Sequence, residues 1–593
     1  MEEKKNKSIN ISQVLAALAI GFVPMLVHMH VYDSHLGSFD WFPNEGATQV
    51  DFFLYYKMIA IIIIAVIMMI VLIVQYKKKK LMWSNAWYLL AGYAVMVLLS
   101  GLFSDYKLWA FGGSYEVFES VIVILCYVCI AFFCYQTVTD KGDLRNICIM
   151  ASVFIFVITL IADLQYFGFD VFRTSLGKRI ITNISAWNEL DSLSFTFEEG
   201  NSYTTLYNTN YLGFFYGLLI PILLVVCIKA KEKGYKIYSF ILLVMSVIAL
   251  VGSNSKTGLI ALFAALAIGL LLTCNSKKNL IRYLAMFGIA GALLVGMYAN
   301  RLGGLNQLFD LIFKGVDYDL DYVVQNIQTN DEDVAIYLNN EKELHISYQL
   351  LEETQSLMIW CYDHDHHKID FELAEDGISW QILDPDYAGC MITPAFIGDY
   401  KGILVRIDKL NLYFTNEIDG TYYYVNPFAK FTKVEPLERT QLFDPGIMSG
   451  RGYIWNRMIP ALKKSIILGS GANTFIMEYP NDDYIAKIYL QSIGNYDVKA
   501  HNLYLQQFME NGLIALLLYL AFYAIYFVDS VKLFRKRELD SNESILAYGI
   551  FLGTLVYMIV SIANDSNVCT APTFWGILGI GIGINQRIRS GQS

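Results

Sequence analysis

Long apolar segments without charge recur along this chain of 593 residues, and they restrict its fold more than any other feature. Many are close to 20 residues long, the length at which an α-helix crosses about 30 Å of hydrocarbon. Hydrophobic residues make up 55% of the sequence and charged residues only 17%, so a water-soluble domain of this size could not bury the apolar surface. The sequence therefore predicts an α-helical multi-pass membrane protein.

We expect about twelve transmembrane helices. They are predicted at residues 11–29, 53–75, 84–103, 118–138, 146–163, 208–229, 237–252, 257–274, 280–299, 511–528, 545–562 and 571–586. The first apolar run follows a basic N-terminal stretch, as in a signal peptide, but it is long enough to span and has no small-residue cleavage site. We therefore expect this first helix to be retained.

Lysine and arginine are distributed unevenly between the two sets of alternate loops. One set contains EEKKNK near the N-terminus, KKKK at 77–80, DKGDLR, KAKEKGYK, SKKNLIR, KLFRKR and the C-terminal tail QRIRSGQS. The opposite loops at 30–52, 104–117, 253–256 and 563–570 carry only Lys107 and Lys256. Because cytoplasmic loops are enriched in basic residues, both termini are predicted to be cytoplasmic. The long segment 300–510 would then be extracytoplasmic.

An acidic module interrupts the helical pattern. Residues 305–445 contain 26 acidic and 9 basic residues, a balance of −17, whereas the whole chain carries −10 and the remainder therefore +7. Short alternating stretches such as HISYQL, GILVRID and TYYYVN, separated by EDG, DPD and IDG, are typical of strands and turns. We expect an inserted β-rich module, with Cys361 and Cys390 able to form a disulfide in an oxidising compartment.

Two motifs place a cation beside a helix start or between glycines. In SNSKTG, Ser255 and Lys256 lie in a tight turn that begins the eighth span, where free N–H groups and an ammonium could bind phosphate. A polar turn with a lysine at the membrane surface is the alternative. In SGRGYIWNR, Arg451 lies between two glycines and could bind a pyrophosphate with two parallel hydrogen bonds. Arg457, on the amphipathic stretch that follows, is a further candidate for substrate binding.

Two further motifs lie before spans. HNLYLQQFMENGL begins with His501, which can accept a proton near neutral pH, and Asn502, which could orient the imidazole or bind a sugar hydroxyl. NTNYLG contains Asn208 and Asn210, which could bind substrate or could cap the sixth span.

In their order and spacing, these motifs resemble those of the O-antigen ligase and polymerase superfamily, bacterial membrane enzymes that use polyprenyl pyrophosphate donors. The resemblance rests on NTNYLG, SNSKTG, SGRGYIW, LGSGANTF and HNLYLQQFMENGL between about residues 204 and 530, and more weakly on FSDYKLWAFGGSYEVFES at 103–120. It implies a membrane glycosyltransferase-like fold with a cavity open to the outer leaflet. It also implies that His501 takes the acceptor's proton while Arg451, assisted by Lys256, stabilises the departing pyrophosphate without a metal or cofactor.

The chain departs from the family pattern in two places. Lys256 stands where these enzymes usually have an arginine, and the module at 305–445 is not one of their standard parts. Aromatic residues of the module could stack on sugar rings or belong to its core: Trp360, Trp380, Tyr422 and Tyr423.

The stretch CYDHDHHKIDF, which gathers five possible metal ligands, is interpreted as an exposed polar hairpin. Side chains alternate along a strand, so no face would collect more than three ligands, and a tetrahedral zinc site would need help from elsewhere. We therefore predict no metal site.

We interpret the chain as a ligase or polymerase of cell-surface polysaccharide in the bacterial cytoplasmic membrane. Its partners would be a polyprenyl-pyrophosphate-linked glycan donor and a glycan or lipid-glycan acceptor, and no nucleic acid. The predicted parts are a membrane domain (1–304), the β-rich insertion (305–445), an extracytoplasmic helical catalytic segment (446–510) and the last membrane helices (511–593).

Two other functions stay open at this point. One is a transporter of a small solute or polysaccharide, which the scarcity of charge at midplane depth disfavours. The other is a non-catalytic scaffold that binds cell-wall glycan through its module.

Overall fold

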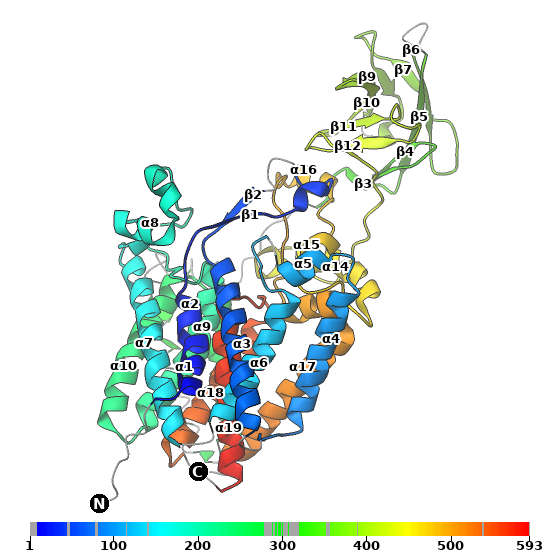
Figure 1. Cartoon of the computed structure of the whole chain (residues 1–593). Helices are drawn as coiled ribbons and strands as arrows, with labels where there is room; N and C mark the ends of the chain where they lie inside the picture. Colours follow the sequence, from blue (N-terminus) through cyan, green and yellow to red (C-terminus); the bar gives the residue numbers. More distant parts are fainter. Residues whose placement is uncertain are drawn as a thin grey trace, which may run out of the picture.

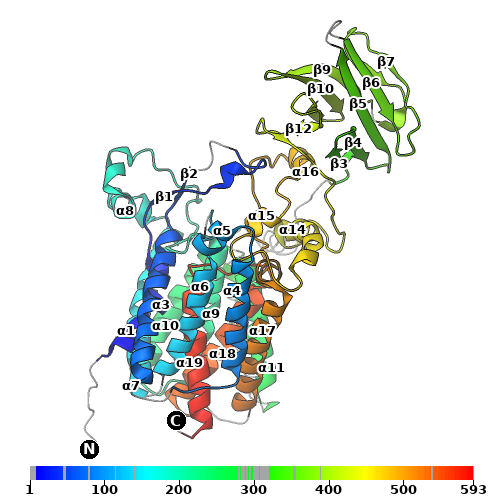
Figure 2. The ribbon, with the colours of Figure 1, turned by 45° about the vertical axis from the view of Figure 1, so that its right-hand side comes forward.

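The protein forms a helical bundle with a smaller β-rich module beyond one of its ends (Figure 1). The computed structural model describes residues 9–43, 48–77, 81–113, 115–138, 141–274, 320–351, 356–387, 389–535 and 539–591, with short pieces between 276 and 306. The start of α1 (Ile11–Ala17) and the end of α19 (Ala571–Arg589) lie at the end of the bundle away from the module (Figures 1 and 2). We call the two ends of the bundle the module end and the terminal end.

Ten long helices build most of the described bundle. They are α3 (Tyr55–Tyr76), α4 (Ala86–Leu102), α6 (Val121–Thr137), α7 (Lys141–Tyr166), α9 (Thr209–Lys229), α10 (Lys233–Gly252), α11 (Lys256–Thr273), α17 (Leu503–Phe534), α18 (Asn542–Val560) and α19. An interrupted first helix combines α1, a π-helical turn (Leu18–Phe22) and α2 (Val23–Met25). Their apolar faces meet in one continuous core.

Seven helices in the described part of the chain are long and apolar enough to cross a membrane: α3, α7, α9, α10, α11, α17 and α18. Three shorter apolar helices, at Ile11–Met25, α4 and α6, coincide with further predicted spans. The ninth predicted span, 280–299, lies largely outside the described residues. A mostly helical, multi-pass membrane protein is thereby supported, while the number of about twelve crossings stays a prediction.

Helix α17 begins earlier than the apolar run that predicted a span at 511–528. Asn502 caps it, accepting from the backbone N–H groups of Tyr504 and Leu505 at 3.0 Å. Its first turns carry polar residues that are buried inside the protein, such as Gln507, which accepts from the Tyr93 hydroxyl at 2.8 Å. Hydropathy missed these turns because their polar groups are paired with protein partners.

Several short elements lie at the module end of the bundle. They are the antiparallel pair β1 (His30–Asp33) and β2 (Thr48–Asp51), and the helices α5 (Lys107–Gly112), α8 (Ser175–Ile181), α14 (Ile447–Ala461), α15 (Phe475–Glu478) and α16 (Tyr484–Tyr489) (Figure 1). Helix α14 contains a break, because its second to fourth residues have left-handed backbone angles.

The module consists of two antiparallel sheets. One has four strands in the order β3 (Val324–Thr329), β4 (Val334–Leu338), β5 (Glu343–Leu351) and β6 (Ser356–Tyr362). The other has seven strands in the order β13 (Phe431–Thr432), β12 (Tyr423–Val425), β11 (Leu410–Thr415), β10 (Tyr400–Ile407), β9 (Met391–Ile397), β8 (Trp380–Ile382) and β7 (Phe371–Leu373). Inward residues such as Ile346 and Val405 join both sheets in one core, as in a sandwich.

The core of the module extends toward the bundle. It includes Trp41 and Phe42 from the loop between β1 and β2, and Tyr484 and Ile485 from α16. The module is therefore packed on elements of the module end.

The module's cysteines and aromatic residues fall mostly inside it. Cys361 and Cys390 are buried free thiols. Of the four aromatic residues considered for stacking on sugars, Tyr422 is buried, whereas the others are partly exposed: Trp360, Trp380 and Tyr423.

Candidate active site

His501 and Asp565 form a close ion-pair contact at the start of α17. Nδ1 of His501 lies 3.1 Å from Oδ2 of Asp565, and the two side chains are 42% and 3% exposed. A carboxylate this close to Nδ1 favours the tautomer with the proton on Nδ1, which leaves the lone pair of Nε2 free. The pair presents a partly exposed ring nitrogen that can accept a proton.

The loop of residues 561–570, between α18 and α19, fixes this pair in place. The second oxygen of Asp565 accepts from the backbone N–H of Asn502 at 3.1 Å. The N–H of Leu503 donates to the carbonyls of Ser561 and Asn564, both at 3.0 Å. The Asp565 carboxylate thus contacts both the side chain of His501 and the backbone of Asn502, the next residue.

Arg451, on α14, reaches the same loop. Its Nη2 donates to Oδ1 of Asn564 at 3.1 Å, and its Nη1 donates to the carbonyl of Met448. Burial lowers the pKa of the Arg451 guanidinium, while the nearby Asp565 carboxylate raises it. Its Nε is buried and has no hydrogen-bond partner among the described residues. A buried cation with a free donor is suited to an anionic ligand.

The turn before Arg451 depends on its glycines. Met448, Ser449 and Gly450 have φ of 51°, 64° and 93°, a left-handed run that glycine adopts without strain. A Cβ on Gly452 would lie 1.9 Å from the carbonyl oxygen of Asp444. Gly452 therefore makes room for the protein's own backbone.

Trp455, in the same motif, attaches α14 to the histidine segment. Its indole N–H donates to the carbonyl of Ala500, the residue before His501, at 2.9 Å. The arginine and histidine motifs are therefore one structural unit.

Lys256, the first residue of α11, completes a cationic group. Its Nζ lies 3.4 Å from the hydroxyl of Ser449, and its charge and that of Arg451 are close enough to repel each other. Thr257, the next residue, accepts from Nδ2 of Asn564 at 2.8 Å. Asn564 thus bridges Arg451 and α11.

Three site turns hold residues other than glycine in left-handed backbone conformations. Asn254, Ser449 and His501 have φ of 53°, 64° and 49°. Such angles cost free energy and concentrate at functional sites. Here they occur in the turns that present Lys256, Arg451 and the imidazole.

A second layer of charge lies beside the loop of residues 561–570. Lys499 is buried and donates to the hydroxyl of Tyr211 on α9. Glu119, just before α6, accepts from the hydroxyl of Ser566 at 2.7 Å. Glu119 therefore holds the loop through Ser566, and Lys499 lies beside it.

Four sequence candidates have structural contacts of their own. Asn208 caps α9, Asn502 caps α17, and Ser255 caps α11 by accepting from Gly258 N–H at 3.2 Å. Arg457 is buried, donates to Asp483 at 2.8 Å and stacks on a tyrosine ring. The structure shows no contact between Arg457 and the described groups around His501. Asn210 lies in the first turn of α9.

Sequence reasoning missed Asn564, Asp565 and Thr257. The signal was present in NDSN (564–567), a polar tetrapeptide between two apolar runs, but nothing in the sequence assigns it to His501 or Arg451. Within the described residues, no three or more His, Cys, Asp or Glu side chains are arranged to hold a metal ion.

Comparison with known proteins adds an independent observation. Residues 420–520, which include Arg451 and His501, match the family model described as O-antigen ligase. Searches of curated proteins and of solved structures found no match. The family match confirms, for this part of the chain, the resemblance to the O-antigen ligase and polymerase superfamily that the sequence motifs indicated.

Proposed function

We propose that the protein transfers a glycan from a polyprenyl pyrophosphate donor, such as undecaprenyl pyrophosphate, to an acceptor hydroxyl. The transfer takes place at the outer face of the cytoplasmic membrane and builds cell-surface polysaccharide, by ligation or polymerisation. One observation carries the proposal: two adjacent residues contact the two candidate groups. Asp565 contacts His501, and Asn564 accepts a hydrogen bond from Arg451. A base and a cation are thereby held by one short loop.

In the proposed reaction, the acceptor oxygen attacks the anomeric carbon of the donor. Nε2 of His501 takes the acceptor's proton as the new C–O bond forms. The bond between the anomeric carbon and the phosphate oxygen breaks, and its electron pair leaves with the polyprenyl pyrophosphate. Asp565 stabilises the imidazolium and keeps Nε2 directed to the acceptor.

Arg451 and Lys256 are assigned to the leaving group. The unpartnered Nε of Arg451 and the ammonium of Lys256 supply positive charge where pyrophosphate charge develops. Pyrophosphate is a good leaving group, so its departure needs chiefly positioning and charge stabilisation. A general base increases the rate by a further factor of about 10²–10⁴. In this scheme the two side chains provide the charge that a metal would otherwise supply, so transfer proceeds without one.

Complementation tests the proposal in cells that lack the protein. The variants are His501→Ala and Arg451→Lys, and the readouts are surface glycan and lipid-linked donor. Both variants are expected to lose surface glycan and accumulate donor. Products shortened to single repeats would identify a polymerase.

Matched control variants are His367→Ala and Arg406→Lys, which change exposed residues of the module. All proteins must reach the membrane in equal amounts. If His501→Ala and Arg451→Lys behave like these controls, the transferase proposal fails, and the transport and scaffold functions take precedence.

A further inference from the structure

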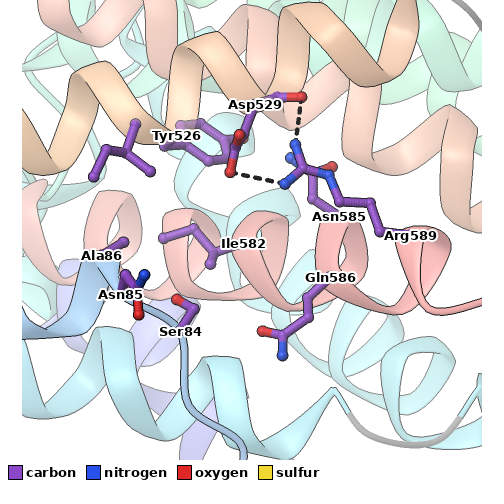
Figure 3. A pocket seen from close by; sticks show the side chains of 10 residues that line it. Ser84, Asn85, Ala86, Tyr526, Asp529, Ile582, Asn585, Gln586 and Arg589 are labelled. Carbon is purple, nitrogen blue, oxygen red and sulfur yellow. Dashed lines mark hydrogen bonds and ion pairs between the residues drawn. The ribbon is translucent and has the colours of Figure 1, made fainter.

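A cavity of about 410 Å³ lies at the terminal end of the bundle, away from the candidate active site. It is bounded by the start of α4 and by the C-terminal parts of α17 and α19 (Figure 3). Its walls are formed by Ser84, Asn85, Ala86, Ile525, Tyr526, Asp529, Ile582, Asn585, Gln586 and Arg589. The volume is within the range of small-molecule sites.

An ion pair lies at one side of this cavity. Nη1 of Arg589 is 2.9 Å from Oδ2 of Asp529, and Nη2 donates to the Asp529 carbonyl at 2.8 Å (Figure 3). A guanidinium has five N–H donors, so these two contacts leave others available to an anion. The pair offers positive and negative charge side by side.

Asn585 supplies the observation that points to a ligand. The residue is only 5% exposed, and its Nδ2 donates to the hydroxyl of Ser530 at 2.9 Å. Its Oδ1 is buried and has no hydrogen-bond partner in the described part of the chain. A buried acceptor without a partner is unfavourable, so a bound group that donates a hydrogen bond would relieve it.

The surroundings of the cavity are those of a membrane boundary. Trp83 and Tyr88, at the start of α4, are 45% and 64% exposed. Exposed tryptophan and tyrosine gather where a membrane meets water. Ile525 and Val528 of α17 are also exposed beside the cavity, as residues that face lipid would be.

We propose that this cavity binds the headgroup of a membrane phospholipid that carries a hydrogen-bond donor beside its phosphate. The phosphate accepts from the remaining N–H groups of Arg589. The donor, an ammonium or a hydroxyl, reaches Oδ1 of Asn585, with Asp529 alongside. The glycerol and upper acyl chains pack on the apolar wall formed by Ala86, Ile525 and Ile582. The site is independent of the proposed transfer reaction.

Thermal unfolding of the full chain in lipid nanodiscs tests the proposal. The lipids are phosphatidylcholine alone, whose headgroup has no donor, and its mixtures with phosphatidylethanolamine or with phosphatidylglycerol. The wild type is expected to unfold at a higher temperature in at least one mixture than in phosphatidylcholine. Phosphatidylethanolamine identifies an ammonium as the donor and phosphatidylglycerol a hydroxyl.

Variants assign the effect to the cavity. Asn585→Leu and Arg589→Gln each remove one partner of the headgroup, and each is expected to abolish the lipid-dependent rise. Native mass spectrometry should show about tenfold weaker retention of the lipid, as expected for loss of one hydrogen bond to a charged group. Arg535→Gln is the matched control, because Arg535 is exposed at the C-cap of α17 and does not line the cavity.

Two results would overturn the proposal. One is an unfolding temperature that is equal in all three lipids. The other is a rise that persists in Asn585→Leu and Arg589→Gln, which would show a general effect of the bilayer. Because these readouts do not involve glycan transfer, they stand apart from the test of the proposed function.

Discussion

Asn564 and Asp565 are neighbours in sequence but serve different parts of the site. The amide of Asn564 lies between Arg451 and Thr257, and the carboxylate of Asp565 lies between His501 and the backbone of Asn502. Two adjacent side chains thus fix the distance between the proposed base and the proposed pyrophosphate ligand. A small shift of this loop would move both groups.

Asp565→Asn should lower the transfer rate sharply while leaving donor binding largely intact. An amide can donate to Nδ1 and so favour the tautomer with the proton on Nε2, which cannot act as a base. We expect kcat to fall by about 10²–10⁴-fold, the contribution of a general base. The measurement is turnover of purified protein at varied donor concentration, which separates kcat from KM.

Asp565→Glu and Asp386→Asn complete this series. The first retains a carboxylate and should recover part of the rate, whereas the second changes an exposed carboxylate of the module that pairs with a lysine. If the Asp565→Asn protein is folded and turns over at the wild-type rate, the Asp565 carboxylate does not determine which ring nitrogen of His501 carries the proton.

At the residue scale, the sequence pointed to the proposed reacting groups but not to the groups that hold them. His501 and Arg451 stand in motifs with recognisable neighbours. Asp565 is separated from His501 by 63 intervening residues, which include the whole of α17 and α18, so only the packing of these helices brings the two together. Asn502 and Ser255 were candidates because of their polarity, and the structure shows that this polarity caps helices.

At the scale of elements, the GSGANTF segment is attached to a bend in α17. Gly512 has φ of 88°, which interrupts the helix and frees backbone carbonyls. The N–H groups of Ser470 and Gly471 donate to the carbonyls of Met509 and Glu510 at 3.1 and 2.8 Å. The glycines of this motif therefore allow backbone contact between two segments.

Gly469→Ala should therefore destabilise the protein. A Cβ at this position would lie 2.1 Å from the carbonyl carbon of Glu510, so α17 and the segment must separate. Overpacking of this kind costs about 1–3 kcal/mol, and the unfolding temperature should fall. Gly112→Ala, where a Cβ would meet nothing within 4 Å, is the matched control. Equal unfolding temperatures for the two variants would show that the contact is not tight.

The four-stranded sheet of the module contains a pH-dependent contact. His345 on β5 lies 2.8 Å from Asp333 and 3.3 Å from Glu343. The hydrogen bond to Asp333 raises the pKa of His345, although burial lowers it. Burial raises the pKa of Asp333, but its hydrogen bonds outweigh burial and lower that pKa overall.

The stability from this contact should be greatest between about pH 4 and pH 6.5. A raised histidine pKa gives a contribution that is complete below about 6.5 and is lost as pH rises through the folded value. The lowered pKa of Asp333 gives a contribution to stability that is present above about pH 3.8, its ordinary pKa, and is lost as pH falls through the pKa in the folded protein. Hydrogen exchange of β4 and β5 should show that His345→Gln weakens the sheet more at about pH 6 than at about pH 8.5. A difference independent of pH, or an equal effect of His367→Gln at an exposed site, would contradict this assignment.

At the scale of the whole molecule, the sequence predicted the helical bundle and the β-rich module better than the way in which they pack on each other. Apolar runs predicted helices because burial in lipid demands them, and alternation predicted the β-rich module because each sheet has one buried face. Neither pattern indicates what lies between the parts. That Trp41 and α16 complete the module's core depends on residues far apart in the chain, which no local pattern connects.

This junction connects the module to the histidine. Tyr496, five residues before His501, has its ring centroid 4.8 Å from that of Phe42 and 5.7 Å from that of Trp41. Both of those rings belong to the module's core. The segment that presents His501 is therefore held from one side by the core of the module and from the other by Trp455.

Trp41→Ala should slow transfer although Trp41 contacts none of the proposed reacting groups. Removing a buried tryptophan costs about 3–5 kcal/mol and loosens the support of Tyr496. A displacement of about 1 Å at a catalytic group can cost about 10²-fold, so we expect kcat to fall by about tenfold or more. Turnover and limited proteolysis of the module would be measured together. Trp187→Ala, an exposed tryptophan also at the module end, is the control and should change neither. Easier proteolysis with an unchanged rate would mean that the bundle and the loop of residues 561–570 position His501 without the module.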